Sequence, residues 1–156
     1  MRVSDEMTSP PVCVTPDISL AEVARDMDER AVGSVLVVED GTLRGIVTDR
    51  DLAVRGMGCG LVSTTRVGDM MSPRVVTVEA SDDLQTAYQT FRRADVRRLP
   101  VLASGQVVGV LTIDDLLLDV FRRLGDLLGP VAWSVLQESR EAAPGNPAPS
   151  DAPPRP

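Results

Sequence analysis

Two eight-residue segments carry side chains that could bind a phosphorylated ligand. Gly45–Leu52 reads GIVTDRDL, and Gly109–Leu116, further along the chain, reads GVLTIDDL. In each segment a Thr is followed three positions later by an Asp, and the pairs are Thr48 with Asp51 and Thr112 with Asp115. The apolar residues before each Thr predict the end of a strand, and the residues after it predict a helix. At such a junction, free backbone amides and the positive end of the helix dipole favour a phosphate. A hydroxyl, a carboxylate and free amides together suit a ribose phosphate.

The same residues have a second interpretation that needs no ligand. A Thr, Ser or Asp at the start of a helix caps the free amides of the first turn. For either segment alone, capping is the better explanation. The recurrence of the segment at a fixed spacing favours a ligand site in each copy.

The composition excludes most catalytic chemistry and most nucleic-acid binding. All sixteen basic residues among the 156 are arginines, so the chain has no Lys for a Schiff base and no His for general-base work. We therefore expect no enzymatic activity. A net charge of −7 repels polyanions, and four aromatic residues (one Trp, one Tyr, two Phe) provide no stacking surface for bases. Nucleic acid is not an expected partner.

The sequence also predicts a soluble, cytoplasmic protein without a metal centre. No apolar run approaches the roughly 20 residues that span a bilayer, and the first ten residues contain no apolar signal core. Cys13 and Cys59 form no C-x-x-C motif, and without histidine the usual zinc sites cannot form. We expect both thiols to be reduced, with Cys13 buried on a strand, and no membrane partner.

The chain is an internal duplication. Residues 2–52 align with residues 66–116 without a gap, and fourteen aligned positions are identical. Two copies are too few for an open solenoid, so we expect a closed α/β pair of β-α-β-β-α motifs related by a pseudo-twofold axis. In the first copy we predict strands at Val12–Val14, Ser34–Val38 and Leu43–Thr48, a helix after Ser19, and a helix from Asp49 that ends before Gly56. In the second copy we predict strands at Val75–Val78, Arg98–Leu102 and Val107–Thr112, and helices at Asp83–Ala94 and from Ile113.

Four segments make up the predicted domain organisation. They are the first motif with its linker (1–64), the second motif (65–128), a helical extension (129–141) and a disordered Pro-rich tail (142–156). The apolar faces of Leu116–Leu128 and Val131–Leu136 exceed what a two-copy core can bury. We therefore expect a homodimer or an unidentified protein partner.

The duplicated pattern resembles a tandem pair of cystathionine-β-synthase (CBS) domains, a Bateman module, over residues 2–128. The resemblance rests on G-h-h-T-x-x-D in each copy (h, apolar), the lead-ins VSDEMT and VGDMMS, the Val-x-Val first strands and VRRLPVL at Val96–Leu102. It implies two motifs packed sheet to sheet, with two clefts that often hold adenine nucleotides. Such modules commonly form dimers and regulate other proteins.

The resemblance also implies the roles of particular residues. Thr48 and Asp51 would meet the ribose in one cleft, and Thr112 and Asp115 in the other. The base would lie against Val14 and Val35 in the first cleft, and against Val78, Leu99, Pro100 and Val101 in the second. Phosphate charge would be met by Arg50 in the first cleft and by Arg97 and Arg98 in the second, although this Arg pair is equally explained as a solubility device at a strand edge. The two clefts should therefore differ.

Two functions follow from this interpretation. The first is a non-enzymatic regulatory module that binds AMP, ADP or ATP, with NAD or S-adenosylmethionine as further candidates and no required cofactor. The alternative is a ligand-free interaction module whose long C-terminal helix is the working surface. The intact Thr and Asp pairs favour the first.

Overall fold

The computed structural model describes residues 1–141, with side chains described for residues 1–134. The chain divides into two compact units, Met1–Leu117 and Leu118–Pro156. Both copies of the duplication lie in the first unit. The second unit begins inside the last helix, and the predicted tail at 142–156 lies outside the described residues. Within the described part of the chain, no helix is long and apolar enough to cross a membrane.

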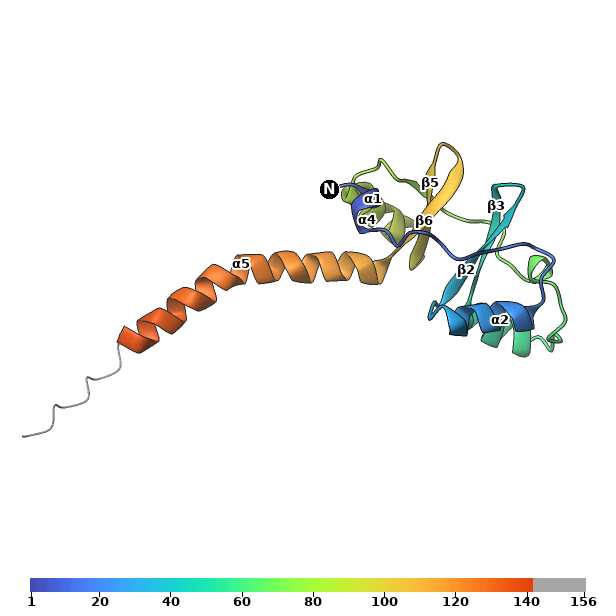
Figure 1. Cartoon of the computed structure of the whole chain (residues 1–156), viewed down its shortest axis with the longest axis horizontal. Coiled ribbons are helices and arrows are strands. Elements are labelled where there is room, and N and C mark those ends of the chain that lie inside the picture. The colour runs from blue at the N-terminus through green and yellow to red at the C-terminus, as the bar shows by residue number, and fades with distance from the viewer. Residues whose placement is uncertain (142–156) are drawn as a thin grey trace, which may run out of the picture. The chain divides into compact units, whose positions relative to one another are not determined.

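The first unit contains two three-stranded sheets, one from each copy (Figure 1). One sheet has the order β1-β2-β3 and the other β4-β5-β6, and in both the first pair is parallel and the second antiparallel. The pairing of Ser34 with Thr48 recurs in the second copy as Arg98 with Thr112. The predicted pair of β-α-β-β-α motifs is therefore confirmed. The strands are β1 (Cys13–Val14), β2 (Ser34–Glu39), β3 (Thr42–Thr48), β4 (Val78–Glu79), β5 (Arg98–Ala103) and β6 (Gln106–Thr112).

Tight turns join the second and third strands of each sheet. Asp40 and Gly41 have φ angles of 50° and 76°, and Ser104 and Gly105 have 51° and 78°. Two successive residues with positive φ are typical of a type I′ hairpin, whose twist matches that of the flanking strands. A hairpin therefore joins β2 to β3 and β5 to β6.

The first strand of each sheet is shorter than predicted. Only Cys13–Val14 and Val78–Glu79 pair with their neighbours. Alternation along β1 places Val14 in the core and leaves Cys13 exposed, so the expectation of a buried Cys13 was wrong. Partial burial of its sulfur nevertheless raises the pKa of the Cys13 thiol.

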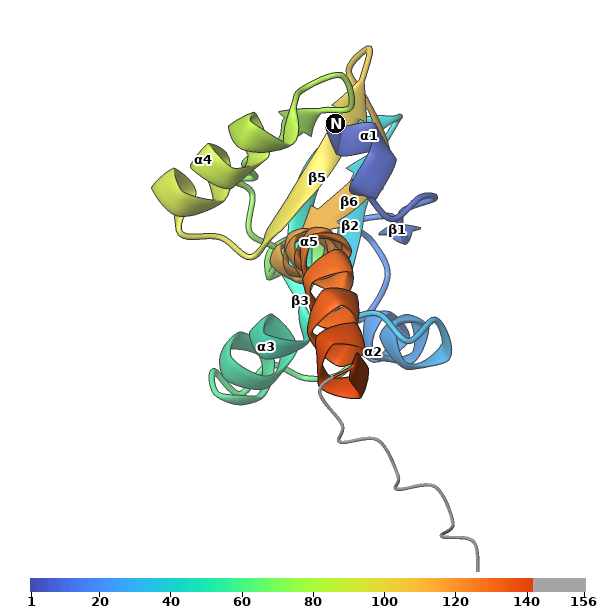
Figure 2. The same ribbon diagram turned by 90° about the vertical axis from the view of Figure 1, so that its left-hand side faces the viewer.

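The helices begin at polar caps. The Ser19 side chain caps α2 and forms a capping box with Glu22, whereas Asp83 caps α4 at the amide of Thr86. Helix α4 lies beside the second sheet, and α2 and α3 lie at the first (Figure 2). The helices are α1 (Val3–Glu6), α2 (Leu20–Glu29), α3 (Asp49–Asp51), the π-helix η1 (Leu52–Met57), the 3-10 helix η2 (Val67–Asp69), α4 (Leu84–Ala94) and α5 (Ile113–Glu141).

Two helices differ from the sequence prediction. The helix after Thr48 is one turn of α3 followed by η1, and it passes Gly56 to end at Met57. Helix α5 runs through Pro130 without a break, so the predicted extension at 129–141 continues the preceding helix.

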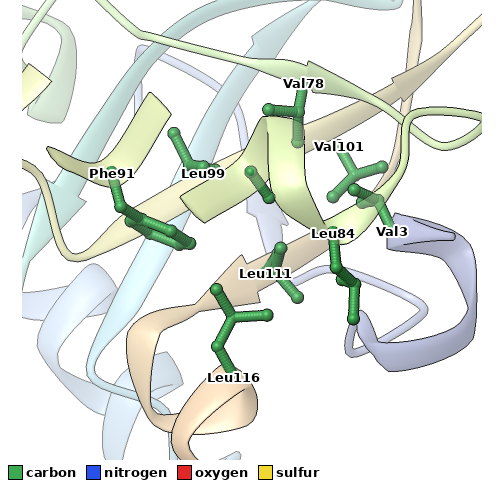
Figure 3. Packing of buried hydrophobic residues seen from close by; sticks show 9 residues of the cluster. Val3, Val78, Leu84, Phe91, Leu99, Val101, Leu111 and Leu116 are labelled. Carbon is green, nitrogen blue, oxygen red and sulfur yellow. The ribbon is translucent and has the colours of Figure 1, made fainter. Parts of the chain in front are cut away.

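Each copy completes the core of the other. Val3, in the lead-in of the first copy, packs with Leu99, Val101 and Leu111 of the second sheet (Figure 3). Reciprocally, Val67 of the second lead-in packs in the core of the first sheet. The backbones are joined as well: Thr8 and Val110 exchange hydrogen bonds of 2.9 and 3.0 Å, and Ser72 and Ile46 exchange bonds of 3.1 and 3.3 Å. The two motifs therefore form one folding unit.

Candidate functional site

Both Thr–Asp pairs form capping boxes. The Thr48 amide and hydroxyl donate to Asp51 Oδ2, both at 2.9 Å, and the Asp51 amide donates to Thr48 Oγ1 at 3.1 Å. Thr112 and Asp115 repeat these bonds at 2.8, 2.7 and 3.2 Å. The capping interpretation is confirmed in both copies. It uses one carboxylate oxygen of each Asp, so Oδ1 keeps its capacity to accept a bond from a ligand.

The amides at the start of α3 are already occupied by the protein. The Asp49 amide donates to the Gly33 carbonyl at 3.2 Å, and the Arg50 amide donates to Asp49 Oδ1 at 2.8 Å. The Asp51 amide is held by Thr48. The sequence-based expectation that free amides here would bind a phosphate was therefore wrong for the first copy. At the start of α3, only side chains have donors available for a phosphate.

Those side chains line a pocket of about 630 Å³, here named the arginine cleft. It brings the end of β3 and the start of α3 together with the start of β5 from the other copy. Four of its residues are arginines: Arg50, Arg74, Arg97 and Arg98. The complete lining is Ile46, Thr48, Asp49, Arg50, Asp51, Ser72, Arg74, Val96, Arg97, Arg98, Thr112 and Asp114.

The charge of the arginine cleft is opposite to that of the chain. Its four guanidinium groups face three carboxylates, so the lining is net positive in a protein of net charge −7. Among the residues that the structure describes, none of the four guanidinium groups has an ion pair or a hydrogen bond. Each group therefore has its donors available for an anion, and a phosphate accepts such donors bidentately.

Arg55 does not line this cleft but contacts two residues that do, and it was missed in the sequence analysis. Its Nη1 donates to Ser72 Oγ at 3.0 Å and lies 3.6 Å from Asp51 Oδ1. Arg55 thus ties the capping carboxylate of the first copy to the lead-in of the second. Its position four residues after Asp51 on a helix was the signal that could have found it.

A second, smaller pocket of about 210 Å³ is the counterpart of the arginine cleft, and it is named here the proline cleft. The alignment of the two copies relates Ser72, Arg74, Val96 and Arg97 of the arginine cleft to Thr8, Pro10, Val32 and Gly33 of the proline cleft. The lining of the proline cleft is Thr8, Pro10, Pro11, Val12, Val32, Gly33, Ser34, Arg98, Val110 and Thr112. Arg98 is the one charged residue in this lining, so the predicted difference between the two clefts is present in the described part of the chain.

Arg98 belongs to both clefts. A Cβ atom at Gly33 would lie 2.8 Å from Arg98 Nη2 and 3.2 Å from Asp49 Oδ2. The absence of a side chain at Gly33 therefore makes room for the guanidinium. Binding of an anion in one cleft will change the electrostatic field in the other.

The structure combines the predicted residues differently from the sequence-based expectation. Thr48, Arg50 and Asp51 share a cleft with Arg97 and Arg98, whereas the sequence analysis placed these groups in separate clefts. Thr112 lines both clefts, and Asp115 lines neither. The residues expected to contact the base are buried and lie in neither lining: Val14, Val35, Val78, Leu99, Pro100 and Val101.

The sequence matches the CBS domain family twice, over residues 3–57 and 67–121. A CBS domain-containing protein of Bacillus subtilis, YhcV, is 35% identical over 114 residues, which cover 73% of this chain and 81% of the relative.

Solved structures have the same architecture. A CBS domain protein of Pyrobaculum aerophilum complexed with AMP is 25% identical, with a TM-score of 0.68 over 74% of this chain and 89% of that one. A CBS domain pair in complex with 5′-methylthioadenosine and S-adenosyl-L-methionine matches in fold at 22% identity, with a TM-score of 0.67 over 81% of this chain and 97% of that one.

Proposed function

Because the chain belongs to the CBS domain family, we propose that it is a regulatory module without catalytic activity that binds an adenine nucleotide between its two motifs. The ligand class is AMP, ADP or ATP, and the arginine cleft is its site. The single observation that carries this proposal is the group of four arginines without ion pairs, among the described residues, in a pocket of about 630 Å³. The AMP complex of the Pyrobaculum aerophilum relative supports the class of ligand.

In this proposal, different residues of the arginine cleft bind the ribose, the phosphates and the base. Asp51 Oδ1 accepts a hydrogen bond from a ribose hydroxyl, because Oδ2 is used by Thr48. Arg50, Arg74, Arg97 and Arg98 contact the phosphates. The side chains of Ile46 and Val96 supply apolar contact for the base.

A second function is favoured by a different observation. Helix α5 exposes a series of large apolar side chains, among them Leu127 at 72% and Trp133 at 66%. A contiguous apolar surface of this kind is typical of an interaction site. An interaction module that binds no ligand is therefore the alternative, and in either case we propose a homodimer.

Replacing Asp51 by alanine is expected to weaken nucleotide binding by roughly ten- to a hundred-fold, because a hydrogen bond to a charged group contributes about 1.5–3 kcal/mol. AMP and adenosine should lose similar amounts, since both contain the ribose. Isothermal titration calorimetry on the full chain measures both affinities.

Asp115→Ala is the matched control. It removes the equivalent capping carboxylate of the second copy. Each variant should lose about 1 kcal/mol of stability in a thermal melt. Asp115 does not line the arginine cleft, so the affinity of that cleft should not change. Equal affinity losses in the two variants would assign Asp51 to capping alone. A wild-type chain that binds no nucleotide at millimolar concentration would favour the interaction module.

A further inference from the structure

Helix α5 carries an apolar stripe of exposed side chains. The stripe consists of Leu117, Phe121, Leu124, Leu127, Leu128 and Val131, here named the α5 stripe, and its side chains are between 46% and 72% exposed. At 3.6 residues per turn these positions fall on one side of the helix. Such a surface has to be covered by something else.

Over Asp119–Asp126 the opposite side of α5 is polar. Arg122, Arg123 and Asp126 lie there, and Arg123 Nε is 2.9 Å from Asp119 Oδ2. The helix is therefore amphipathic in its own right and not apolar all round.

The spacing of the stripe indicates that its partner is another helix. Leu117, Phe121, Leu124, Leu128 and Val131 are separated by four, three, four and three residues. This 3.5-residue period is the repeat of a left-handed coiled coil. In a coiled coil, the side chains of one helix pack into the holes between side chains of the other. A pocket for a small ligand has no such period.

The charges of α5 favour a second copy over a membrane. Within Leu117–Val131, Asp119 and Asp126 balance Arg122 and Arg123, so two copies do not repel each other along the stripe. A helix that lies on a membrane surface carries an excess of Lys and Arg on its polar side, and α5 has none. With a net charge of −7, the chain is also repelled by anionic lipid.

The area of the stripe is sufficient for a stable dimer. Its exposed apolar surface is on the order of 600 Å² per copy, so a symmetric pair would bury about 1,200 Å², the lower limit of specific interfaces. A two-fold pair covers the same surface on both chains.

We propose that α5 pairs with α5 of a second copy along the α5 stripe. The inference rests on the homodimer part of the proposed function and not on nucleotide binding.

The test is the mass of the full chain, measured by light scattering after size exclusion at micromolar concentration. Wild type should have twice the chain mass of 16.7 kDa. The double variant Leu124→Asp, Leu128→Asp should have the mass of one chain, with a dimer dissociation constant raised at least roughly 100-fold. The control Arg122→Gln, Arg123→Gln changes the net charge by the same amount on the opposite side of the helix and should remain a dimer.

A milder pair, Leu124→Ala with Leu128→Ala, keeps the helix propensity of these positions and should still weaken the dimer about tenfold.

Monomeric wild type would overturn both the homodimer and the α5 pairing. A dimeric Asp variant would overturn the α5 pairing alone and would indicate another surface, such as the apolar groove between α2 and η1 that Ala24, Met57 and Leu61 line. Co-sedimentation of wild type with phosphatidylglycerol vesicles would overturn the pairing and assign the stripe to lipid. The Asp variant should bind ATP as wild type does, which separates this test from that of the nucleotide site.

Discussion

Replacing Arg97 and Arg98 together by alanine is expected to weaken ATP binding by about a hundred-fold or more, because two charged hydrogen-bonding groups are lost from the phosphate site. Adenosine has no phosphate, so its affinity should change little. The two guanidinium groups line the arginine cleft, and no described carboxylate pairs with either. Calorimetric titration of the variant with ATP and adenosine measures the difference directly.

The chain offers a control for this pair of substitutions. Arg92 and Arg93 are also adjacent, and they lie exposed on α4, outside the lining of both clefts. Arg92→Ala with Arg93→Ala changes the net charge by the same amount. Any loss of ATP affinity in this control therefore measures the effect of the protein's long-range electrostatic field. Equal losses for ATP and adenosine in the Arg97, Arg98 variant would contradict the phosphate role. Those arginines would then shape the cleft without touching the ligand.

Local structure could be predicted from the sequence because it depends on near neighbours. The spacing of Thr48 and Asp51 defines a capping box, and Asp40 with Gly41 defines a hairpin turn. Both features recur in the second copy in the same register. The duplication therefore predicted the two sheets and the pseudo-twofold pair.

The composition of the clefts could not be predicted, because it depends on which copy each segment packs against. The lead-ins of the two copies have the same pattern. Hydrophobic periodicity does not show whether a lead-in packs on the sheet of its own copy or on the sheet of the other copy. In the structure, one cleft contains both Thr48 of the first copy and Arg97 and Arg98 of the second. A site assembled within each copy, as the sequence suggested, would have separated them.

The residues assigned to the base lie outside both cleft linings for a related reason. β2 and β5 each have three consecutive buried residues, a pattern typical of a strand covered on both faces. Such a run does not show which side chains would face a ligand. Val35 and Leu99 are fully buried in the cores, and the clefts are lined by the residues just before them.

The same exchange explains why each eight-residue segment begins with glycine. A Cβ atom at Gly109 would lie 2.5 Å from Met7 Sδ and 2.9 Å from the Thr8 carbonyl oxygen. In the other copy a Cβ atom at Gly45 would lie 2.6 Å from Met71 Sδ. Each glycine thus lets the lead-in of the opposite copy approach the strand closely enough to form its backbone bridge.

Gly109→Ala is therefore expected to lower the free energy of unfolding by about 3 kcal/mol, the upper end of the usual cost of overpacking. Met7 can move, but the Thr8 carbonyl is held by the Val110 amide at 3.0 Å and cannot move without breaking that bond. Urea denaturation of the full chain measures the change. Gly125→Ala on α5 is the control, because a Cβ atom there meets nothing within 4 Å, and it should raise stability by up to about 1 kcal/mol.

A double-mutant cycle with Met7→Ala isolates the contact between the copies. Shortening Met7 removes the sulfur that the new Cβ atom would meet, so the double variant should be more stable than the sum of the single losses by about 1–2 kcal/mol. The clash with the Thr8 carbonyl remains, so the recovery should be incomplete. Additive losses would show that Met7 does not meet Gly109, and the exchange of lead-ins would lose its main support. Because each lead-in completes the core of the other copy, both sheets should unfold in one transition in every variant.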